Sequence, residues 1–495
     1  MNILLISPKY DSCIIAPHLG LGYLSSNLKK YGHEVKILDG LREEIKYNPV
    51  NWDLVGITAM STYFPEACQE VERAKSYGLK TIIGGPHIIC DPEQSLIDSQ
   101  ADYTATGEGE RTINQLASGL ELNLVEGLVY WKDGKPKRSN PNMKKLFEQK
   151  KMYTTKIGNQ SRDFQIDIDD FGEPDWESID PRSYPKIMPH GMVYKSLPLA
   201  PIITTRGCPY SCTYCSAPIT AGKRMRYRDP VKVVDSIEML VKKYNVKEIQ
   251  IEDDNFTLKR HHAVAICEEL IKRKIKIFWC LPNGVRIDKL DPDLLRLMKK
   301  SGCYQMSLGI ESANQRILDM IKKRLNKNLV RKTVEEIKKA GIEAVGFFMI
   351  GFPGETKEEI KETINFACSL ELDRATFSKV IPLPGTELYD IWLEKYSKNS
   401  NIDWKTFSSE QYSAEWSECT SKEIEKLQIF GFLKFYLTKF RFFKMLFSLK
   451  RNQFILFSKR VIKFAFTSKL YNRIFTKQST NLKFINPRVR RNWRI

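Results

Sequence analysis

The sequence predicts an α/β protein in which a doubly wound, Rossmann-like domain is followed by a partial (β/α)6 barrel and an α-helical C-terminal region. Two observations predict the two α/β parts. Short apolar runs alternate with helical patterns through the first 135 residues, and six further strand–helix units follow between residues 199 and 390. The 495 residues leave room for about three domains. We therefore expect a domain at 1–135, a linker at 136–198, the barrel at 199–390 and the C-terminal region at 391–495.

The N-terminal domain is predicted to be a parallel sheet with helices on both faces. Ligands of such sheets bind outside the carboxyl ends of the strands, which here carry small or glycine-rich segments at Thr58–Thr62, Gly84–His87 and Gly107–Glu110. No G-x-G-x-x-G sequence follows a strand, so we do not expect a dinucleotide there. The expected strands are Asn2–Ser7, Glu34–Leu38, Leu54–Thr58, Lys80–Ile83 and Tyr103–Ala105, with helices at Leu19–Tyr31 and Phe64–Tyr77.

The barrel is predicted to be partial, because six units do not close the usual ring of eight. Chemistry in such barrels gathers at the C-terminal ends of the strands. Amphipathic patterns predict helices such as Asp291–Lys300, Leu329–Ala340 and Glu355–Leu370. The expected strands are Ala200–Thr205, Glu248–Glu252, Lys276–Leu281, Tyr304–Ile310, Ala344–Ile350 and Ala375–Ile381.

Three cysteines with the spacing C-x3-C-x2-C, Cys208, Cys212 and Cys215, closely follow the first barrel strand. Three thiolates on one tight loop can hold three corners of a [4Fe–4S] cube and leave the fourth iron open to another ligand. A closed zinc site or free buried thiols are the alternatives. Tetrahedral zinc fits poorly, because no fourth Cys or His lies nearby in the sequence.

This loop resembles the signature of the radical S-adenosylmethionine (radical SAM) superfamily, including the aromatic Tyr214 before the last cysteine. The resemblance implies a cluster on the three cysteines that binds SAM through its amino and carboxylate groups. It also implies SAM contacts at the strand ends. Acidic residues at such positions are often helix caps or salt-bridge partners instead, which is the alternative for Asp253, Asp254 and Glu311. The expected SAM contacts are Tyr214, Asp253, Asp254, Arg286, Glu311, Ser312 and Gly351.

The N-terminal domain resembles the cobalamin-binding domain found upstream of many radical SAM enzymes. The matching segments are the opening strand, His18–Leu24, Gly84–His87 and Gly107–Glu110. No D-x-H-x-x-G motif is present, so the resemblance implies cobalamin bound without a protein histidine, and neither His18 nor His87 is expected to ligate cobalt. The expected cobalamin contacts are Thr58, Ser61, Gly84, Gly85, Pro86, His87, Gly107 and Glu108.

Two alternatives for this domain stay open. It can be a degenerate domain that binds nothing. Alternatively, Cys13, Cys68 and Cys90 can hold a second cluster as in radical SAM methylthiotransferases, although their flanks and spacings do not match that family.

The charge is concentrated in the C-terminal region. The net charge is +19, and residues 426–495 hold 18 Lys and Arg and no Asp or Glu. Phenylalanines interleave with these cations, from Phe430 to Phe447 and again over Phe454–Phe466. Three interpretations compete: peripheral binding to an anionic membrane, RNA binding, which we favour least, and helices that cap the barrel mouth and bury the aromatics.

The predicted function is methylation of an unactivated carbon by a cobalamin-dependent radical SAM enzyme, with a lipid-like substrate if the tail binds membranes. The alternatives are oxidation or cyclisation without methyl transfer, as in the related porphyrin-ring cyclases, or a sensor with a vestigial barrel. A one-electron donor such as flavodoxin or ferredoxin is implied. The N-terminus predicts a strand instead of a signal peptide, so we expect a cytoplasmic protein, with peripheral contact to the inner membrane face if the tail docks there. The sequence identifies neither the substrate nor a catalytic acid or base.

Overall fold

The computed structural model describes residues 1–10, 16–47, 52–139, 167–184, 194–396 and 416–443. Its N-terminal sheet has seven strands in the order β2-β1-β3-β4-β5-β6-β7. The first five in this order are parallel, and their order is that of flavodoxin-like sheets, in which ligands bind near β1 and β3. The doubly wound prediction is therefore confirmed. These strands are β1 (Asn2–Ser7), β2 (Glu34–Asp39), β3 (Leu54–Thr58), β4 (Lys80–Gly84) and β5 (Tyr103–Ala105).

Strand β1 shows why this sheet is covered on both faces. Successive side chains of a strand point to opposite faces. Ile3 and Leu5 pack in the core that contains α1 (Leu19–Lys30) and α5 (Gly109–Ala117). Leu4 and Ile6 pack in a second core with α2 (Phe64–Ser76) and α4 (Pro92–Ser99). The continuous apolar run of β1 is thus the pattern of a strand buried on both sides.

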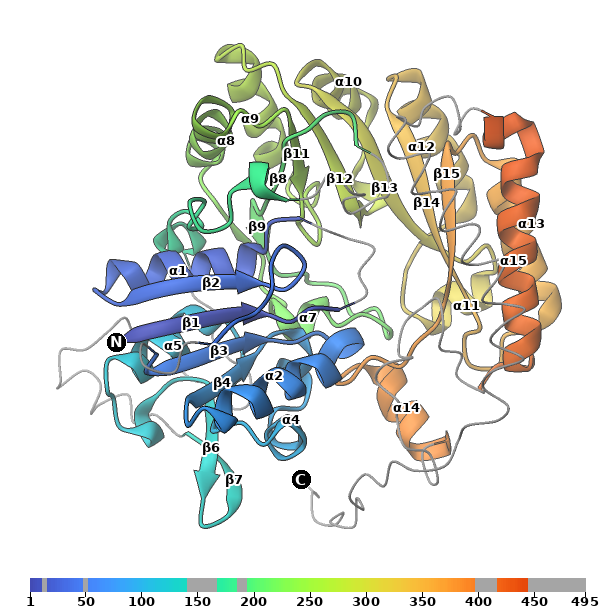
Figure 1. Cartoon of the computed structure of the whole chain (residues 1–495). Coiled ribbons are helices and arrows are strands. Elements are labelled where there is room, and N and C mark those ends of the chain that lie inside the picture. The colour runs from blue at the N-terminus through green and yellow to red at the C-terminus, as the bar shows by residue number, and fades with distance from the viewer. Residues whose placement is uncertain (11–15, 48–51, 140–166, 185–193, 397–415, 444–495) are drawn as a thin grey trace. The chain divides into compact units, whose positions relative to one another are not determined.

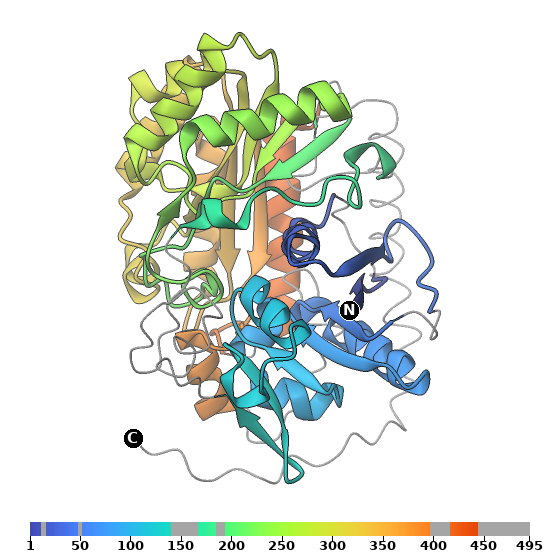
Figure 2. The ribbon, with the colours of Figure 1, turned by 90° about the vertical axis from the view of Figure 1, so that its left-hand side faces the viewer.

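A hairpin that the sequence analysis missed extends this sheet. Strands β6 (Leu128–Lys132) and β7 (Lys135–Arg138) pair antiparallel, and β6 also pairs antiparallel with β5. They form the teal hairpin in Figure 2. The turn residues Asp133 and Gly134 both have positive φ, +51° and +72°, as a two-residue type I′ turn requires. The Asp-Gly pair was therefore a readable hairpin signal.

The barrel sheet has six parallel strands in the order β15-β14-β13-β12-β11-β8, as predicted for a partial barrel. Its strands are β8 (Leu199–Ile202), β11 (Glu248–Ile251), β12 (Phe278–Val285), β13 (Cys303–Glu311), β14 (Glu343–Ile350) and β15 (Arg374–Lys379). Figure 1 shows the helices along one side of the strands. These helices are α8 (Pro230–Tyr244), α9 (Arg260–Lys272), α10 (Pro292–Lys300), α12 (Lys327–Lys339) and α13 (Lys357–Ser369).

Two predicted strand boundaries were wrong. The expected strand Ala200–Thr205 is divided into β8 and the short β9 (Thr205–Arg206), which pairs with a different partner. Strand β12 continues to Val285, four residues beyond the predicted end, after a register shift against β13. Pro282 and Gly284 there mimic the end of a strand in the sequence.

The C-terminal region supplies the sixth outer helix. After α14 (Glu387–Tyr396), α15 (Ser421–Leu437) packs against β15 and α13. Phe435 of α15 is fully buried and Phe432 lies edge-on to Phe377 of β15, whereas Phe430 is exposed. Buried and exposed aromatic side chains therefore occur in the same helix. Phe447 and Phe454–Phe466 lie outside the described residues.

No helix in the described part of the chain is both long enough and apolar enough to cross a bilayer. Within the predicted linker, the described stretch 167–184 has short 3-10 turns at Ile168–Phe171 and Pro181–Ser183. Its side chains Trp176 and Ile179 are buried in the same core as α1 and the barrel helices.

Candidate cofactor site

The three cysteines lie on a loop closed by a two-stranded ribbon. Strand β9 pairs antiparallel with β10 (Arg226–Tyr227), and the Cys208 amide donates to the Gly222 carbonyl (2.9 Å). Gly207 has φ +105°, and a Cβ there would lie 2.4 Å from the Arg224 carbonyl oxygen, so glycine is required. The ribbon and this close approach fix where the cysteine loop starts.

The three cysteines of this loop are partly exposed. Burial, together with the charges of Cys212 and Cys208, raises the pKa of Cys215 to about 12. The Cys215 thiolate therefore needs a positive partner to persist. Iron supplies that charge in a cluster, since thiolates are the ligands of iron–sulfur centres.

Two acidic residues after β5 hold the stem of the loop. Arg206 donates to Glu108 Oε1 (3.0 Å) and to Glu110 Oε1 (2.9 Å), and Arg226 pairs with Glu108 (2.8 Å). Burial alone would raise the pKa of Glu108, but the two guanidinium groups hold it below its ordinary value. Gly107, with φ +124°, turns the chain before Glu108. The carboxylate of Glu108, an expected cobalamin contact, is thus committed to the cysteine loop.

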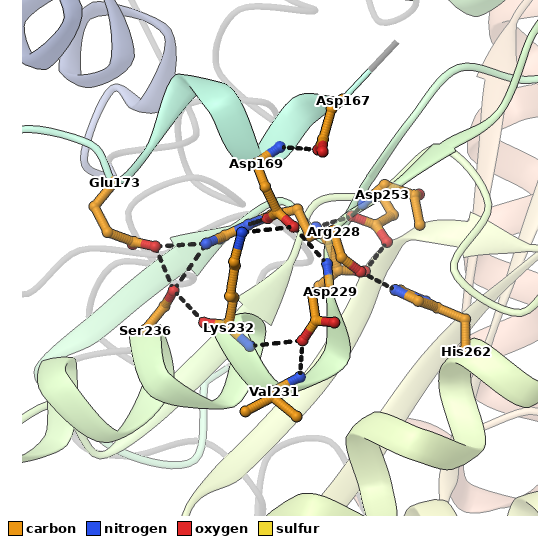
Figure 3. Close-up of polar contacts among 12 residues, drawn as sticks. Asp167, Asp169, Glu173, Arg228, Asp229, Val231, Lys232, Ser236, Asp253 and His262 are labelled. Atoms are coloured by element: carbon orange, nitrogen blue, oxygen red, sulfur yellow. Dashed lines mark hydrogen bonds and ion pairs between the residues drawn. The ribbon is translucent and has the colours of Figure 1, made fainter.

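A second ion-pair network holds the residues after β10 (Figure 3). Arg228 donates to Asp169 (3.2 Å) and Glu173 (2.5 Å) of the linker. Its backbone amide donates to the Thr204 carbonyl (2.9 Å), and its carbonyl oxygen lies 3.0 Å from His262 Nε2. The linker therefore contributes to the site's framework, although the sequence predicted only an irregular connection.

Asp253 and Asp254, which follow β11, have different roles. Asp253 is buried and accepts hydrogen bonds from the amides of Thr204 (2.6 Å) and Thr205 (3.0 Å). Burial raises the pKa of Asp253 to about 6 despite these bonds. Asp254 is exposed, and its charge raises the pKa values of Cys208 and Cys215, so it lies near the cysteine loop. Of the two carboxylates, Asp254 is the one accessible to a ligand.

Tyr214 and Glu311 meet in a buried polar cluster with Lys323. The Tyr214 hydroxyl donates to Glu311 Oε1 (2.9 Å), and Lys323 Nζ lies 2.9 Å from the same oxygen. Burial and the Glu311 charge raise the pKa of Tyr214 well above its ordinary value, so the hydroxyl keeps its proton. Glu311 has φ +67°, a strained conformation for a side chain of its kind. Two expected SAM contacts are therefore brought together beside the cysteine loop.

Arg286 lies against the same loop. Its guanidinium carbon is 3.9 Å from the centre of the Tyr210 ring, a cation–π contact, and its Nη1 donates to the Lys323 carbonyl (3.2 Å). Asp288 pairs with its Nε (2.8 Å). Tyr210 lies between Cys208 and Cys212, so Arg286 holds the middle of the loop.

Ser312 and Gly351, the remaining expected SAM contacts, serve the scaffold. The Ser312 hydroxyl lies 3.1 Å from the Thr363 hydroxyl of α13 and is buried. Gly351 has φ +86°, donates to Glu355 (2.6 Å) and accepts from the Trp416 indole (2.7 Å). These bonds shape the turn after β14.

The strand ends of the N-terminal sheet form the expected cobalamin edge. Gly85 has φ +109°, and a Cβ there would lie 2.5 Å from the Ala59 carbonyl oxygen and 3.1 Å from the Thr58 hydroxyl. A Cβ on Gly84 would meet only the side chain of Ala105, at 3.6 Å, so there is room beside it. Met60 is 47 % exposed at the end of β3. An open glycine and an exposed apolar side chain at one edge fit a flat, bulky ligand.

His87 is part of the scaffold of this edge. Pro86 begins the short helix α3 (Pro86–Cys90), and the His87 ring is buried at a centroid distance of 4.1 Å from Phe64. Its Nδ1 lies 3.0 Å from the Ser61 hydroxyl, and burial lowers its pKa to about 4. His18 accepts the Leu21 amide at the start of α1 (3.3 Å). Both rings are thus engaged within the protein.

The donor set fits an iron–sulfur cluster better than a single metal ion. Within the described ranges, no three His, Cys, Asp or Glu side chains converge on one ion. A cube of four irons is larger than an ion, so its thiolates need not converge on a point. Cys68 lies in α2 and Cys90 ends α3, while Cys13 lies outside the described residues.

Sequence reasoning missed the residues that position the site. Arg206 stands two residues before Cys208, and Glu110 ends the segment Gly107–Glu110, so the sequence offered their opposite charges as a possible pair. Lys323 follows Glu311 by twelve residues in an irregular segment, and no pattern in the sequence marks it. Asp169 and Glu173 lie in a linker without periodicity.

Comparison with known proteins gives two family matches. The model described as "B12 binding domain" matches residues 14–117, and the "Radical SAM superfamily" model matches residues 202–367. An uncharacterized methyltransferase of Pyrococcus horikoshii, PH0819, is 30 % identical over 461 residues, which are 88 % of this chain and 93 % of that protein. The cytidylyl-2-hydroxyethylphosphonate methyltransferase of Streptomyces wedmorensis is 28 % identical and covers 78 % of this chain and 80 % of its own length.

A solved structure shares the fold. The radical S-adenosylmethionine methyltransferase TsrM from Kitasatospora setae, with cobalamin and a [4Fe–4S] cluster bound, matches with a TM-score of 0.66 at 18 % identity. The match covers 86 % of this chain and 80 % of that chain.

Proposed function

Because the chain belongs to the cobalamin-binding radical SAM enzymes, with a [4Fe–4S] cluster, SAM and cobalamin as cofactors, we propose that it methylates an unactivated carbon of a small or lipid-like molecule. One observation carries this proposal. Arg206, two residues before Cys208, is ion-paired with Glu108 and Glu110 at the edge where cobalamin is expected. A direct link between the two cofactor sites suits a reaction that uses both.

The chain's residues divide the work of binding. When bound, the cluster supplies the electron that cleaves SAM, and cobalamin supplies a methyl group. Cys208, Cys212 and Cys215 hold the cluster through three thiolates. Asp254 accepts a hydrogen bond from the ammonium group of SAM. Glu311, oriented by the Tyr214 hydroxyl, accepts one from a ribose hydroxyl. Asp253, Ser312 and Gly351 position these strand ends, and Arg286 holds the loop through Tyr210.

At the N-terminal edge, small residues admit the corrin. Gly84, Gly85 and Gly107 add no side chain to this edge, and we assign the polar contacts to Thr58 and to Ser61, whose hydroxyl lies 3.0 Å from His87 Nδ1. No histidine of this edge is assigned to cobalt. A one-electron donor of the flavodoxin or ferredoxin class reduces the cluster.

Anaerobic turnover with methyl-labelled SAM tests this function. Reconstituted enzyme, supplied with candidate acceptors, is expected to give 5′-deoxyadenosine together with labelled product. 5′-Deoxyadenosine with an unlabelled, oxidised or cyclised product would instead favour chemistry without methyl transfer. No 5′-deoxyadenosine from enzyme with a full cluster would contradict both.

The outward face of α15 is relevant to the choice of substrate, because we infer that it docks on an anionic membrane surface. Leu433 and Leu437 are 58 % and 73 % exposed at helical spacing, and Phe440, which follows, is 75 % exposed. A groove of about 210 Å³ lies between α13 and α15 next to Phe430, and it is lined by Lys357 and Lys361 of α13, by Lys426 and Leu427 of α15, and by one acidic residue, Glu423. Apolar side chains rimmed by lysines suit the interface of a bilayer, where each basic residue contributes about 1 kcal/mol.

The charge of the C-terminal sequence supports this occupant. Residues 426–495 hold 18 basic and no acidic residues, a distribution complementary to anionic headgroups. A cytoplasmic enzyme docked in this way meets lipid substrates at the inner membrane face, which makes an isoprenoid or similar lipid the first acceptor to try.

Flotation with vesicles of phosphatidylcholine, with or without phosphatidylserine, tests the membrane contact. The full chain is expected to float only with anionic vesicles at low salt, and L433S/L437S/F440S is expected not to float with them. Ile97→Ser, at an exposed position of α4, is the matched control. Equal flotation of both variants, or none for the natural chain, would contradict the assignment.

A further inference from the structure

Lys323 is a buried lysine held in a strained segment. It is 9 % exposed, and its neighbours Lys322 and Arg324 have φ +56° and +52°. Positive φ is costly for residues other than glycine and persists where the surrounding structure enforces it. Burying a lysine is costly as well, unless its charge is compensated. Backbone strain and the burial of a charge, which both destabilise the fold, occur together here, and this indicates a functional reason for the cation.

The immediate partners of Lys323 compensate its charge in part. Its Nζ lies 2.9 Å from Glu311 Oε1 and 3.2 Å from the Tyr214 hydroxyl. A Cβ on Gly309 would lie 2.8 Å from both the carboxylate and Nζ, so the glycine leaves space for the pair. The sheet is thus adapted to admit this ammonium group.

The ammonium group also faces the cysteine loop. The Thr213 amide donates to the Ile321 carbonyl (3.2 Å), which ties the loop to the strained segment. Lys323 Nζ lies 3.2 Å from the hydroxyl of Tyr214, which stands between Cys212 and Cys215 in the loop. Lys323 therefore places a buried cation beside the loop that carries the cluster ligands.

The other charges near the loop do not replace it. Arg286 is paired with Asp288 and stacked on Tyr210, so its charge is already compensated. Asp254 adds a negative charge on the loop's side. Reducing the cluster adds one further electron to a site that already holds three thiolates.

We propose that Lys323 is the fixed counter-charge of the iron–sulfur cluster, which raises its midpoint potential and so lets a cellular one-electron donor reduce it. A nearby cation stabilises the reduced, more negative form of the cluster more than the oxidised form. The same ammonium group orients Glu311 and Tyr214, so Lys323 is a positioning residue. This inference depends on the cluster and not on the later transfer of a methyl group.

Electron paramagnetic resonance, followed during a dithionite titration of SAM-free enzyme, tests this role. Lys323→Met is expected to lower the ratio of reduced to oxidised cluster at a fixed potential about tenfold, which is ~59 mV for one electron. Lys323→Arg keeps the charge and is expected to stay near the natural potential. Equal midpoints for the natural protein and Lys323→Met, both with full iron content, would overturn the proposal.

A second variant keeps the test decisive if Lys323→Met assembles no cluster. Glu311→Gln removes the negative charge beside Lys323 and is expected to shift the midpoint upward. Tyr214→Phe, which removes a hydroxyl and no charge, is its control. No upward shift in Glu311→Gln would count against the electrostatic account. Absence of a cluster from the natural protein would instead refute the cofactor assignment, so the two failures are distinguishable.

Discussion

Glu108→Gln tests the link between the N-terminal domain and the cysteine loop. Glu108 is bonded to the guanidinium groups of Arg206 (3.0 Å), which is mostly buried, and of Arg226 (2.8 Å), which is fully buried. Removing one partner of a buried pair costs about 3–5 kcal/mol, because the other charge stays buried. Since Glu110 still pairs with Arg206 in the variant, we expect about 3 kcal/mol. At about 2–4 °C per kcal/mol, the unfolding midpoint falls by about 6–12 °C.

The assay compares holoenzymes reconstituted under anaerobic conditions. Thermal unfolding is followed by fluorescence, and iron and cobalamin are counted in the same samples. Turnover gives a second readout: because the stem no longer fixes the loop to the cobalamin edge, methylated product per 5′-deoxyadenosine is expected to fall. The control is Glu93→Gln, which breaks a surface pair with Arg138 and is expected to cost less than about 1 kcal/mol.

The reasoning fails if Glu108→Gln unfolds at the same temperature as Glu93→Gln and keeps its product ratio. It also fails if Glu108→Gln loses cobalamin while its stability and iron content stay unchanged. That result would return Glu108 to the role of a direct cobalamin contact.

Three further predictions concern single residues of the site. Burial lowers the pKa of His87 from 6.5 to about 4, so as the pH falls the unfolded chain is protonated at this residue before the folded chain is. The free energy of unfolding, measured with urea, is therefore expected to fall by about 2 kcal/mol between pH 7.5 and 5. His87→Phe should remove this pH dependence. Asp254→Asn is expected to weaken SAM binding about tenfold by calorimetry at unchanged stability, whereas Asp253→Asn destabilises the fold; the reverse pattern would contradict their assigned roles. Gly85→Ala, whose Cβ would lie 2.5 Å from a carbonyl oxygen, is expected to lose cobalamin, and Gly119→Ala, where the space is open, to keep it; equal cobalamin content would refute the argument.

The fold was predictable because local patterns specify it. The alternation of β1 between two cores and the C-x3-C-x2-C spacing are properties of neighbouring residues. The β6–β7 hairpin was missed, although the Asp133-Gly134 pair is a sequence signal for a two-residue hairpin turn. The boundary errors at β8 and β12 arose where a strand is interrupted or carries Pro and Gly, since these residues resemble loop composition.

The division of roles within the site was not predictable, because it depends on contacts between distant residues. Asp253 and Asp254 are adjacent in the sequence. Only the folded position of Thr204, whose amide donates to Asp253, shows that the Asp253 carboxylate is used within the protein. Glu108 and Arg206 are 98 residues apart. Lys323 has no motif at all, and its importance follows from burial and backbone strain, which are properties of the folded chain.

The central claim is that this chain joins a cobalamin site to a radical SAM cluster, and cobalamin content tests it most directly. The full chain is reconstituted with iron, sulfide and hydroxocobalamin under anaerobic conditions, desalted, and measured by absorbance and cobalt analysis. The account predicts about one cobalamin per chain beside a full cluster. A full cluster with no bound cobalamin would contradict it and leave a radical SAM enzyme whose N-terminal sheet binds no cofactor.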